Sequence, residues 1–111
     1  NKEIEWMAEK IVNLRIFADK EGKMNLSPRD IGAEMLIVSK FTLYGDCRKG
    51  RRPGYSQAAS PDIAEPLYEL FIAKVEQLGI ATARGKFGAM MDVALVNDGP
   101  VTLLLDSDKI F

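Results

Sequence analysis

The segment 97–102, Asn-Asp-Gly-Pro-Val-Thr, constrains the fold most strongly because it separates two segments whose apolar residues alternate along the chain. Asp-Gly between such segments predicts a tight turn, since glycine adopts positive φ without a Cβ clash. Pro100 is less usual here because proline has a fixed φ and no N–H to donate to a sheet. Turn statistics favour an ordinary tight turn, and the alternative is a turn that exposes backbone carbonyls.

Hydrophobic periodicity predicts helices and strands on both sides of the chain's midpoint. Apolar residues at helical spacing predict an amphipathic helix over residues 3–14. A second helical stripe begins at Ser60-Pro61 and ends at Gly79, although Pro66 suggests that the regular helix starts near Glu65. The remaining expectations are a central strand at 34–39, strands at 84–87, 91–96 and 101–106, a short strand at 15–18, a turn at 19–23 and a loop at 24–29 broken by Ser27-Pro28.

These elements favour one α+β domain over residues 1–111, with two helices packed on a mostly antiparallel, barrel-like sheet. The single cysteine excludes an internal disulfide, and neither a signal peptide nor an apolar run of membrane-spanning length is present, so a cytoplasmic protein is expected. Because the chain starts at Asn1 and enters a helical pattern directly, we expect that an N-terminal segment is missing.

The absence of histidine limits the available chemistry more than any residue that is present. The chain by itself cannot form a Ser-His or Cys-His arrangement or a histidine-based zinc site. The formal net charge of −1 indicates that contact with a nucleic acid would require a local basic patch. Arg48, Lys49, Arg51 and Arg52 form such a patch, which suits a phosphate backbone as well as an ordinary solvated loop.

Five segments together carry a resemblance to a known family. They are Asn13-Leu14-Arg15, Ser39-Lys40-Phe41-Thr42-Leu43, Lys49-Gly50-Arg51-Arg52-Pro53, Gly85-Lys86-Phe87-Gly88-Ala89 and the segment 97–102. With them the chain closely resembles the D-aminoacyl-tRNA deacylases over essentially its whole length. The family has further N-terminal strands, including an arginine that fixes the Gly-Pro carbonyls, and no residue of this chain matches that arginine.

The resemblance implies a homodimer that hydrolyses the ester between a D-amino acid, or glycine, and the terminal adenosine of tRNA, as chiral proofreading in translation. In the family a cis Gly-Pro peptide, here Gly99-Pro100, reaches into the partner's active site, and no cofactor or metal is used. The implied catalytic residues are Ser39, Phe41, Thr42, Gly99 and Pro100. The implied substrate-binding residues are Lys40, Phe87, Met90, Asn97, Val101 and Thr102, with Arg48, Lys49, Arg51 and Arg52 binding tRNA.

Elementary chemistry agrees with this activity, because an aminoacyl ester is already an activated electrophile. Positioning and backbone N–H donors near Phe41 and Thr42 would stabilise the oxyanion without a strong side-chain base. One alternative is that the Thr42 hydroxyl is the nucleophile, but no activating base is visible near it in sequence. The other is that Thr42 only packs in a strand, where threonine is common. Rigid backbone that crowds the L side-chain position would exclude L-substrates while admitting glycine and D-residues.

Several residues keep two interpretations. Lys40 stands where the family usually has glutamine, so it would alter adenosine recognition, bind a phosphate or point to solvent. Phe87, Met90 and Met91 line an adenine pocket or pack in the core. Tyr44 and Tyr55 would stack on a base, Cys47 is more typical of a bystander than of a reactive thiol, and Asp106 with Asp108 is a weak Mg²⁺ candidate. The competing functional hypothesis is a catalytically impaired RNA-binding or assembly module of the same fold.

Overall fold

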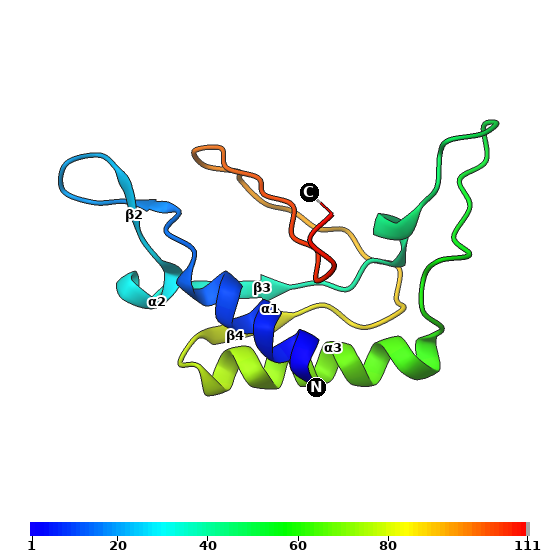
Figure 1. Ribbon diagram of the computed structural model, residues 1–111, viewed down its shortest axis with the longest axis horizontal. Coiled ribbons are helices and arrows are strands. Elements are labelled where there is room, and N and C mark those ends of the chain that lie inside the picture. Colours follow the sequence, from blue (N-terminus) through cyan, green and yellow to red (C-terminus); the bar gives the residue numbers. More distant parts are fainter. Residues whose placement is uncertain (111) are drawn as a thin grey trace.

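The computed structural model describes residues 1–110 of the 111-residue chain as a small α+β fold (Figure 1). Three α-helices, one 3-10 helix and four short strands make up its regular structure. In chain order they are α1 (Lys2–Asn13), β1 (Phe17–Ala18), β2 (Met24–Leu26), α2 (Pro28–Ile31), β3 (Glu34–Ile37), the 3-10 helix η1 (Phe41–Tyr44), α3 (Pro61–Gln77) and β4 (Ala81–Arg84).

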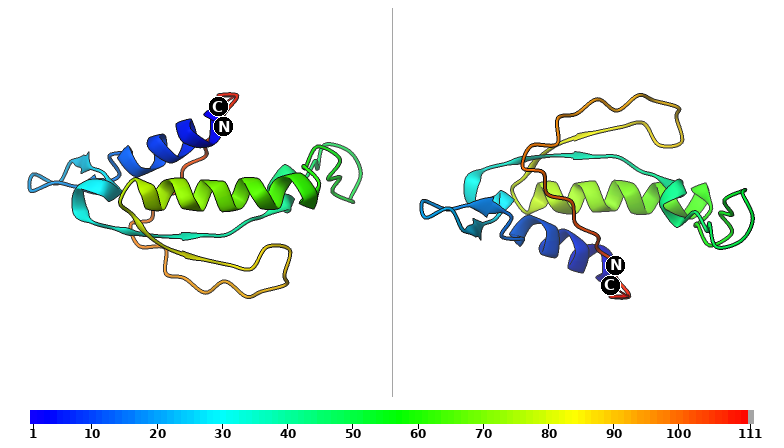
Figure 2. Two further views of the ribbon diagram at one scale, coloured as in Figure 1. Left: turned by 90° about the horizontal axis from the view of Figure 1, so that it is seen from below. Right: turned by 90° about the horizontal axis from the view of Figure 1, so that it is seen from above.

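The core lies where α1 crosses α3, and α3 runs along the pair of strands β3 and β4 (Figure 2). Helix α1 forms where the sequence predicts it, with acidic residues in the first turn and Lys10 in the last, in agreement with the helix dipole. Its apolar stripe contributes Ala8 and Val12 to a buried cluster with Val75 and Ile80. Burial of this stripe stabilises a helix that would be marginal alone at this length.

Helix α3 is continuous from Pro61 to Gln77, so the expectation of a regular start near Glu65 is wrong. Ser60 and Pro61 do form its N-terminal boundary, as the sequence predicts. Pro66 lies inside the helix, where it removes one backbone donor near the N-terminal end. Ile72 and Val75 are fully buried farther along, and this packing outweighs the local defect at Pro66.

The loop expected at 24–29 does not form, because β2 and the first residues of α2 occupy most of it. Ser27 does not break regular structure but caps α2: its hydroxyl accepts a hydrogen bond from the Asp30 N–H, and the Asp30 carboxylate accepts one from the Ser27 N–H. Gly32 ends the helix with φ of 65°, a left-handed conformation that favours glycine. The pattern Ser-Pro therefore marks a helix start here rather than an interruption.

The sheet differs from the expected one in direction and extent. β3 and β4 pair in parallel, with Glu34 opposite Ala81 and Ile37 opposite Arg84, while β1 and β2 form a separate antiparallel ribbon. The expected strand at 84–87 is therefore replaced by Ala81–Arg84. Helix α3 serves as the crossover that a parallel pair requires, since its length returns the chain to the start of β3.

The expected strands at 91–96 and 101–106 are absent from the described structure, although their alternation is strand-like. These two segments overlap in Figure 1 but separate in Figure 2, so no ladder joins them. Most of their apolar side chains face solvent: Val96 is 91% exposed, and Leu95 and Leu104 are 70% exposed, whereas Met91 and Leu105 are half-buried. An alternating segment becomes a strand only when a neighbouring strand accepts its hydrogen bonds.

Candidate functional site

The first motif of the candidate site follows β3 directly. The chain leaves β3 at Ile37 and turns into η1, which contains Phe41 and Thr42, so the motif lies on a 3-10 turn rather than on a strand. Ser39 is half-buried, whereas Lys40 and Thr42 are exposed. Phe41 is 64% exposed, which is unusual for a phenylalanine in a protein of this size. The motif therefore presents a polar and aromatic surface to solvent.

The N–H groups of Phe41 and Thr42 open η1, where the first amides of a helix have no partner within the helix. Within residues 1–110 neither N–H donates a hydrogen bond, whereas Leu43 N–H donates to the Lys40 carbonyl at 3.4 Å. Two adjacent donors are therefore available at an exposed position. Such a pair is the backbone arrangement that stabilises an oxyanion.

Tyr55 packs on the motif from the far side of the basic loop. Its ring meets the ring of Phe41 edge to face, with centroids 5.1 Å apart. Gly45 lies between the Tyr55 ring and the Thr42 backbone. A Cβ at Gly45 would lie 3.0 Å from the Thr42 carbonyl oxygen and 3.1 Å from the Tyr55 ring. The loop thus returns to the motif, and glycine permits the close approach.

The basic loop is closed at its base by a pair of backbone hydrogen bonds. Asp46 N–H donates to the Gly54 carbonyl at 2.7 Å, and Gly54 N–H donates back to Asp46 at 3.0 Å. The Asp46 carboxylate also accepts two hydrogen bonds from the Arg48 guanidinium, at 2.9 and 2.8 Å. The hydrogen bonds from Arg48 lower the pKa of the Asp46 carboxyl to about 2.

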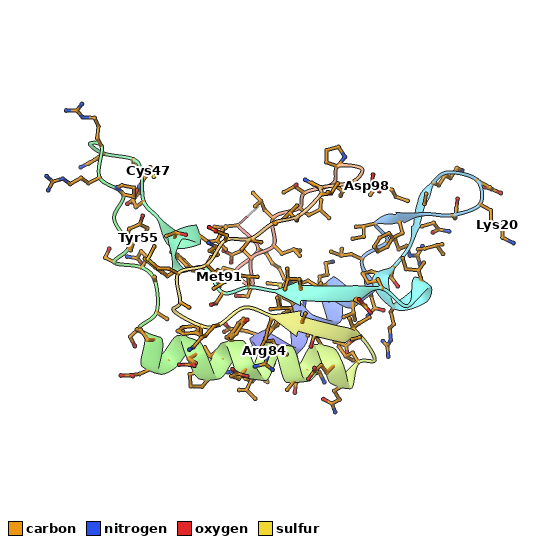
Figure 3. The ribbon with its side chains drawn as sticks, turned by 180° about the vertical axis from the view of Figure 1, so that it is seen from behind. Lys20, Cys47, Tyr55, Arg84, Met91 and Asp98 are labelled. Carbon is orange, nitrogen blue, oxygen red and sulfur yellow. The ribbon has the colours of Figure 1, made fainter. Side chains whose placement is uncertain are left out.

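Arg48 therefore differs from the other three cations of the candidate tRNA-binding set. All four are exposed, but Arg48 pairs with Asp46, whereas Lys49, Arg51 and Arg52 form no ion pair among residues 1–110. Figure 3 shows this loop, marked by Cys47, projecting away from the helices and strands. The sequence could not distinguish Arg48 from its neighbours, because the pairing depends on the loop geometry.

The second motif contains a cis peptide bond between Gly99 and Pro100, as the resemblance implies. Gly99 has φ of 128°, so only glycine adopts this backbone without strain. Asn97, Val101 and Thr102 are exposed beside it. Figures 1 and 3 place this turn, marked by Asp98, toward the β1–β2 end of the molecule and η1 toward the opposite end. One chain therefore does not bring the two motifs together.

The expected adenine-pocket residues differ in their surroundings. Phe87 is half-buried, with its ring 5.9 Å from the ring of Tyr68. Met91 packs near Gly85, where a Cβ would lie 2.9 Å from the Met91 Sδ atom. Met90 is fully exposed and contributes to no core.

Tyr68 is the residue that sequence reasoning missed. Periodicity predicts only that it belongs to the apolar stripe of the second helix, yet its hydroxyl donates to the Ile37 carbonyl at 2.6 Å. The available signal was chemical: a tyrosine on a buried stripe needs a hydrogen-bond partner for its hydroxyl.

The weaker candidates gain no support from the geometry. Asp106 and Asp108 lie in a local turn in which Asp108 N–H donates to the Asp106 carboxylate at 2.7 Å. No group of three or more metal-ligating side chains occurs in the described part of the chain. Cys47 is exposed, and Tyr44 is exposed as well.

In residues 1–110 no helix has the length and apolar character needed to cross a membrane.

The family model for D-Tyr-tRNA(Tyr) deacylase matches residues 1–106 of this chain. The chain belongs to the D-Tyr-tRNA(Tyr) deacylase family. Among curated members, the D-aminoacyl-tRNA deacylase of Desulfotalea psychrophila is 67% identical over 99% of this chain and 74% of its own length. The D-aminoacyl-tRNA deacylase of Thermosipho africanus is 64% identical over 100% of this chain and 75% of its own length.

A solved structure also matches this deacylase fold. It is named c-Myc DNA Unwinding Element Binding Protein, and it superimposes with a TM-score of 0.87 at 41% sequence identity. The match covers 95% of this chain and 72% of that chain. The α+β arrangement described above is therefore the arrangement of a known fold.

Proposed function

We propose that this chain is a D-aminoacyl-tRNA deacylase that hydrolyses the ester between a D-amino acid and the 3′-terminal adenosine of tRNA. Free D-amino acid and tRNA are the products. The observation that carries the proposal is the pair of unpartnered N–H groups at Phe41 and Thr42, exposed within residues 1–110 of a chain that belongs to this family. Glycyl-tRNA mischarged on tRNA-Ala is a second substrate, because glycine has no side chain for the site to exclude.

The proposed chemistry needs no histidine. The ester carbonyl lies against the Phe41 and Thr42 amides, which stabilise the negative charge that develops on its oxygen during attack. The terminal 2′-hydroxyl of the ribose assists water, and binding supplies the orientation. Ser39 lines the same pocket. Thr42 acts through its amide rather than its hydroxyl, because a nucleophilic hydroxyl needs an activating base and the chain has no histidine.

The proposed site has two chains. Gly99 and Pro100 of one subunit approach Ser39, Phe41 and Thr42 of the other, and their carbonyls hold the substrate's amino group while the backbone excludes an L side chain. Two observations support a homodimer: the two motifs lie apart in one chain, displaced toward different ends of the molecule, and the chain carries exposed apolar side chains near both. Asn97, Val101 and Thr102 flank the turn and contact the substrate.

The exposed surface of the β3–β4 sheet supports a larger, barrel-like sheet in the complete protein. β3 and β4 form a sheet of only two strands, and Leu36 on β3 is 57% exposed. A surface hollow of about 340 Å³ runs over both strands. Further strands from an N-terminal segment would cover it, within the single domain that we propose for the chain.

The proposed contacts with tRNA fall into two groups. Lys49, Arg51 and Arg52 bind backbone phosphates, while Arg48 mainly orders the loop through Asp46. Phe87 and Met90 contact the terminal adenosine, and the exposed Lys40 lies on the same side as η1, where it binds a phosphate or the base. A protein with these contacts works where aminoacyl-tRNA is found, in the cytoplasm.

The deciding experiment measures hydrolysis of matched D- and L-aminoacyl-tRNA by this chain and by a version that carries whatever precedes Asn1 in the native gene. Cleavage of the D-ester with the L-ester spared supports the proposal, and comparison of the two versions shows what the preceding segment contributes. Equal cleavage of both esters contradicts chiral exclusion. If tRNA binds to both versions without turnover, the alternative of a catalytically impaired RNA-binding module is correct.

A further inference from the structure

The Tyr68 hydroxyl lies where the two parallel strands end. It donates to the Ile37 carbonyl at 2.6 Å, and the Gly85 carbonyl oxygen lies 3.4 Å from it. Ile37 is the last residue of β3, and Gly85 directly follows β4. The Ile37 carbonyl also accepts the Gly85 N–H at 3.3 Å, so both of its lone pairs are engaged at this fork.

Each strand leads from this fork to one half of the candidate site. Ile37 precedes Ser39 by two residues and the η1 amides by a few more, while Gly85 precedes Phe87 by two. The Tyr68 ring itself lies 5.9 Å from the Phe87 ring, tilted by 48°. One side chain on α3 thus contacts the start of both functional segments.

Little else holds the segments together beyond the fork. The parallel ladder stops at Ile37 and Arg84, and the Gly85 N–H adds one more hydrogen bond before the chains separate. Val38 and Met91 pack around Gly85, where a Cβ would lie 3.6 Å and 2.9 Å from their nearest atoms. Within residues 1–110, the Tyr68 hydroxyl is therefore the side-chain group that hydrogen-bonds at this fork, where the two segments separate.

We propose that Tyr68 is a positioning residue for deacylation: it fixes the η1 amides relative to Phe87 without touching the substrate. The inference rests on the proposed function, since it assigns these two segments to the same substrate. A displacement of about 1 Å between an oxyanion donor and the group that holds the adenosine is enough to lower catalysis by about a hundredfold. The tRNA-binding loop at 46–54 lies outside the fork and keeps its own closure.

The test variant is Tyr68→Phe in the full-length protein, because phenylalanine keeps the ring and removes only the hydroxyl. The Ile37 carbonyl retains the Gly85 N–H, so the melting temperature should fall by less than about 5 °C. We expect kcat for D-aminoacyl-tRNA to fall tenfold or more with KM within about twofold. In the free protein, the backbone amide NMR signals of Phe41, Thr42 and Phe87 should shift.

Glu69→Gln is the matched control, since Glu69 is the next residue on α3 and pairs with Arg84 on the solvent side of the same strand end. It should leave kcat within about twofold and the Phe41 and Thr42 amide signals in place. Unchanged kcat in Tyr68→Phe, or an equal loss in both variants, overturns the proposal. If the wild-type protein does not cleave the D-ester, the proposed function fails, and the amide shifts alone then decide whether Tyr68 positions η1.

Discussion

The rings of Phe41 and Tyr55 meet at an interplanar angle of 72°, with centroids 5.1 Å apart, so η1 and the basic loop share one aromatic contact. Phe41 is 64% exposed and Tyr55 is 39% exposed, and this contact joins two segments that are separated by the whole projecting loop. The orientation of the loop relative to η1 therefore depends on this aromatic pair and on the close approach of the Tyr55 ring to Gly45. An aromatic pair of this geometry contributes about 0.5 to 1.5 kcal/mol.

Removing the Tyr55 ring should separate the loop from η1. In Tyr55→Ala we expect KM for D-aminoacyl-tRNA to rise about three- to tenfold, because the free energy of one aromatic pair corresponds to about that factor. Tyr55→Phe keeps the ring and should resemble the wild type. Steady-state kinetics on both variants measures the effect. A larger loss in the phenylalanine variant would show that the hydroxyl, rather than the ring, is what matters.

The basic loop should show unequal contributions from its four cations. Neutralising Lys49, Arg51 and Arg52 together should weaken tRNA binding and flatten the plot of log affinity against log salt by about 0.7 to 0.9 for each phosphate that the loop no longer neutralises. Arg48→Ala should change the slope less, since the guanidinium faces Asp46. Binding titrations at several salt concentrations provide the slopes. Identical slopes for the wild type and all variants would show that the loop is solvated and does not bind tRNA.

Thr42 separates the amide mechanism from the nucleophile mechanism. Thr42→Ala retains the backbone N–H, so kcat should fall less than about tenfold if the amide stabilises the oxyanion. A nucleophilic hydroxyl predicts a loss of several orders of magnitude in a folded protein, with partial recovery in Thr42→Ser. Single-turnover kinetics and circular dichroism on the two variants distinguish these outcomes.

Asp46 gives the basic loop an acid sensitivity. The pKa of Asp46 is lowered to about 2 by hydrogen bonds from Arg48, so the folded state binds this proton less readily than the unfolded state does. The associated stabilisation is full above the ordinary aspartate pKa of about 4 and is lost as the pH falls toward 2. The small difference in melting temperature between wild type and Asp46→Asn should therefore be constant above about pH 4 and vanish near pH 2. A difference that persists at the acidic end of this range would contradict the assignment.

The sequence predicted the elements whose stability is local. The helix at 3–14 and the boundary of α3 at Ser60-Pro61 follow from periodicity and capping, and both are present. The interpretation of Ser27-Pro28 as a break is wrong, although Ser27 and Asp30 have the spacing of a capping box and Pro28 follows the cap, so this helix start is visible in the sequence.

The errors concern contacts between distant parts of the chain. The parallel register of Glu34 with Ala81 joins segments separated by α3, and periodicity contains no information on the direction of pairing. The alternation at 91–96 and 101–106 is strand-like, but within residues 1–110 no strand lies beside these segments to accept their hydrogen bonds. For the candidate site, both motifs are recognisable in the sequence. The pairing of Arg48 with Asp46 and the hydrogen bond of the Tyr68 hydroxyl depend on the three-dimensional structure.

The distance between the Gly99-Pro100 turn and η1 has a genetic consequence under the proposed two-chain arrangement. One allele that damages only the turn and another that damages only η1 would each abolish both sites of their own homodimer. Expressed together, they would form mixed dimers in which one site receives an intact turn and an intact η1, while the other receives both defects. Two inactive gene products would thus restore up to half of the activity of a wild-type dimer in each mixed pair.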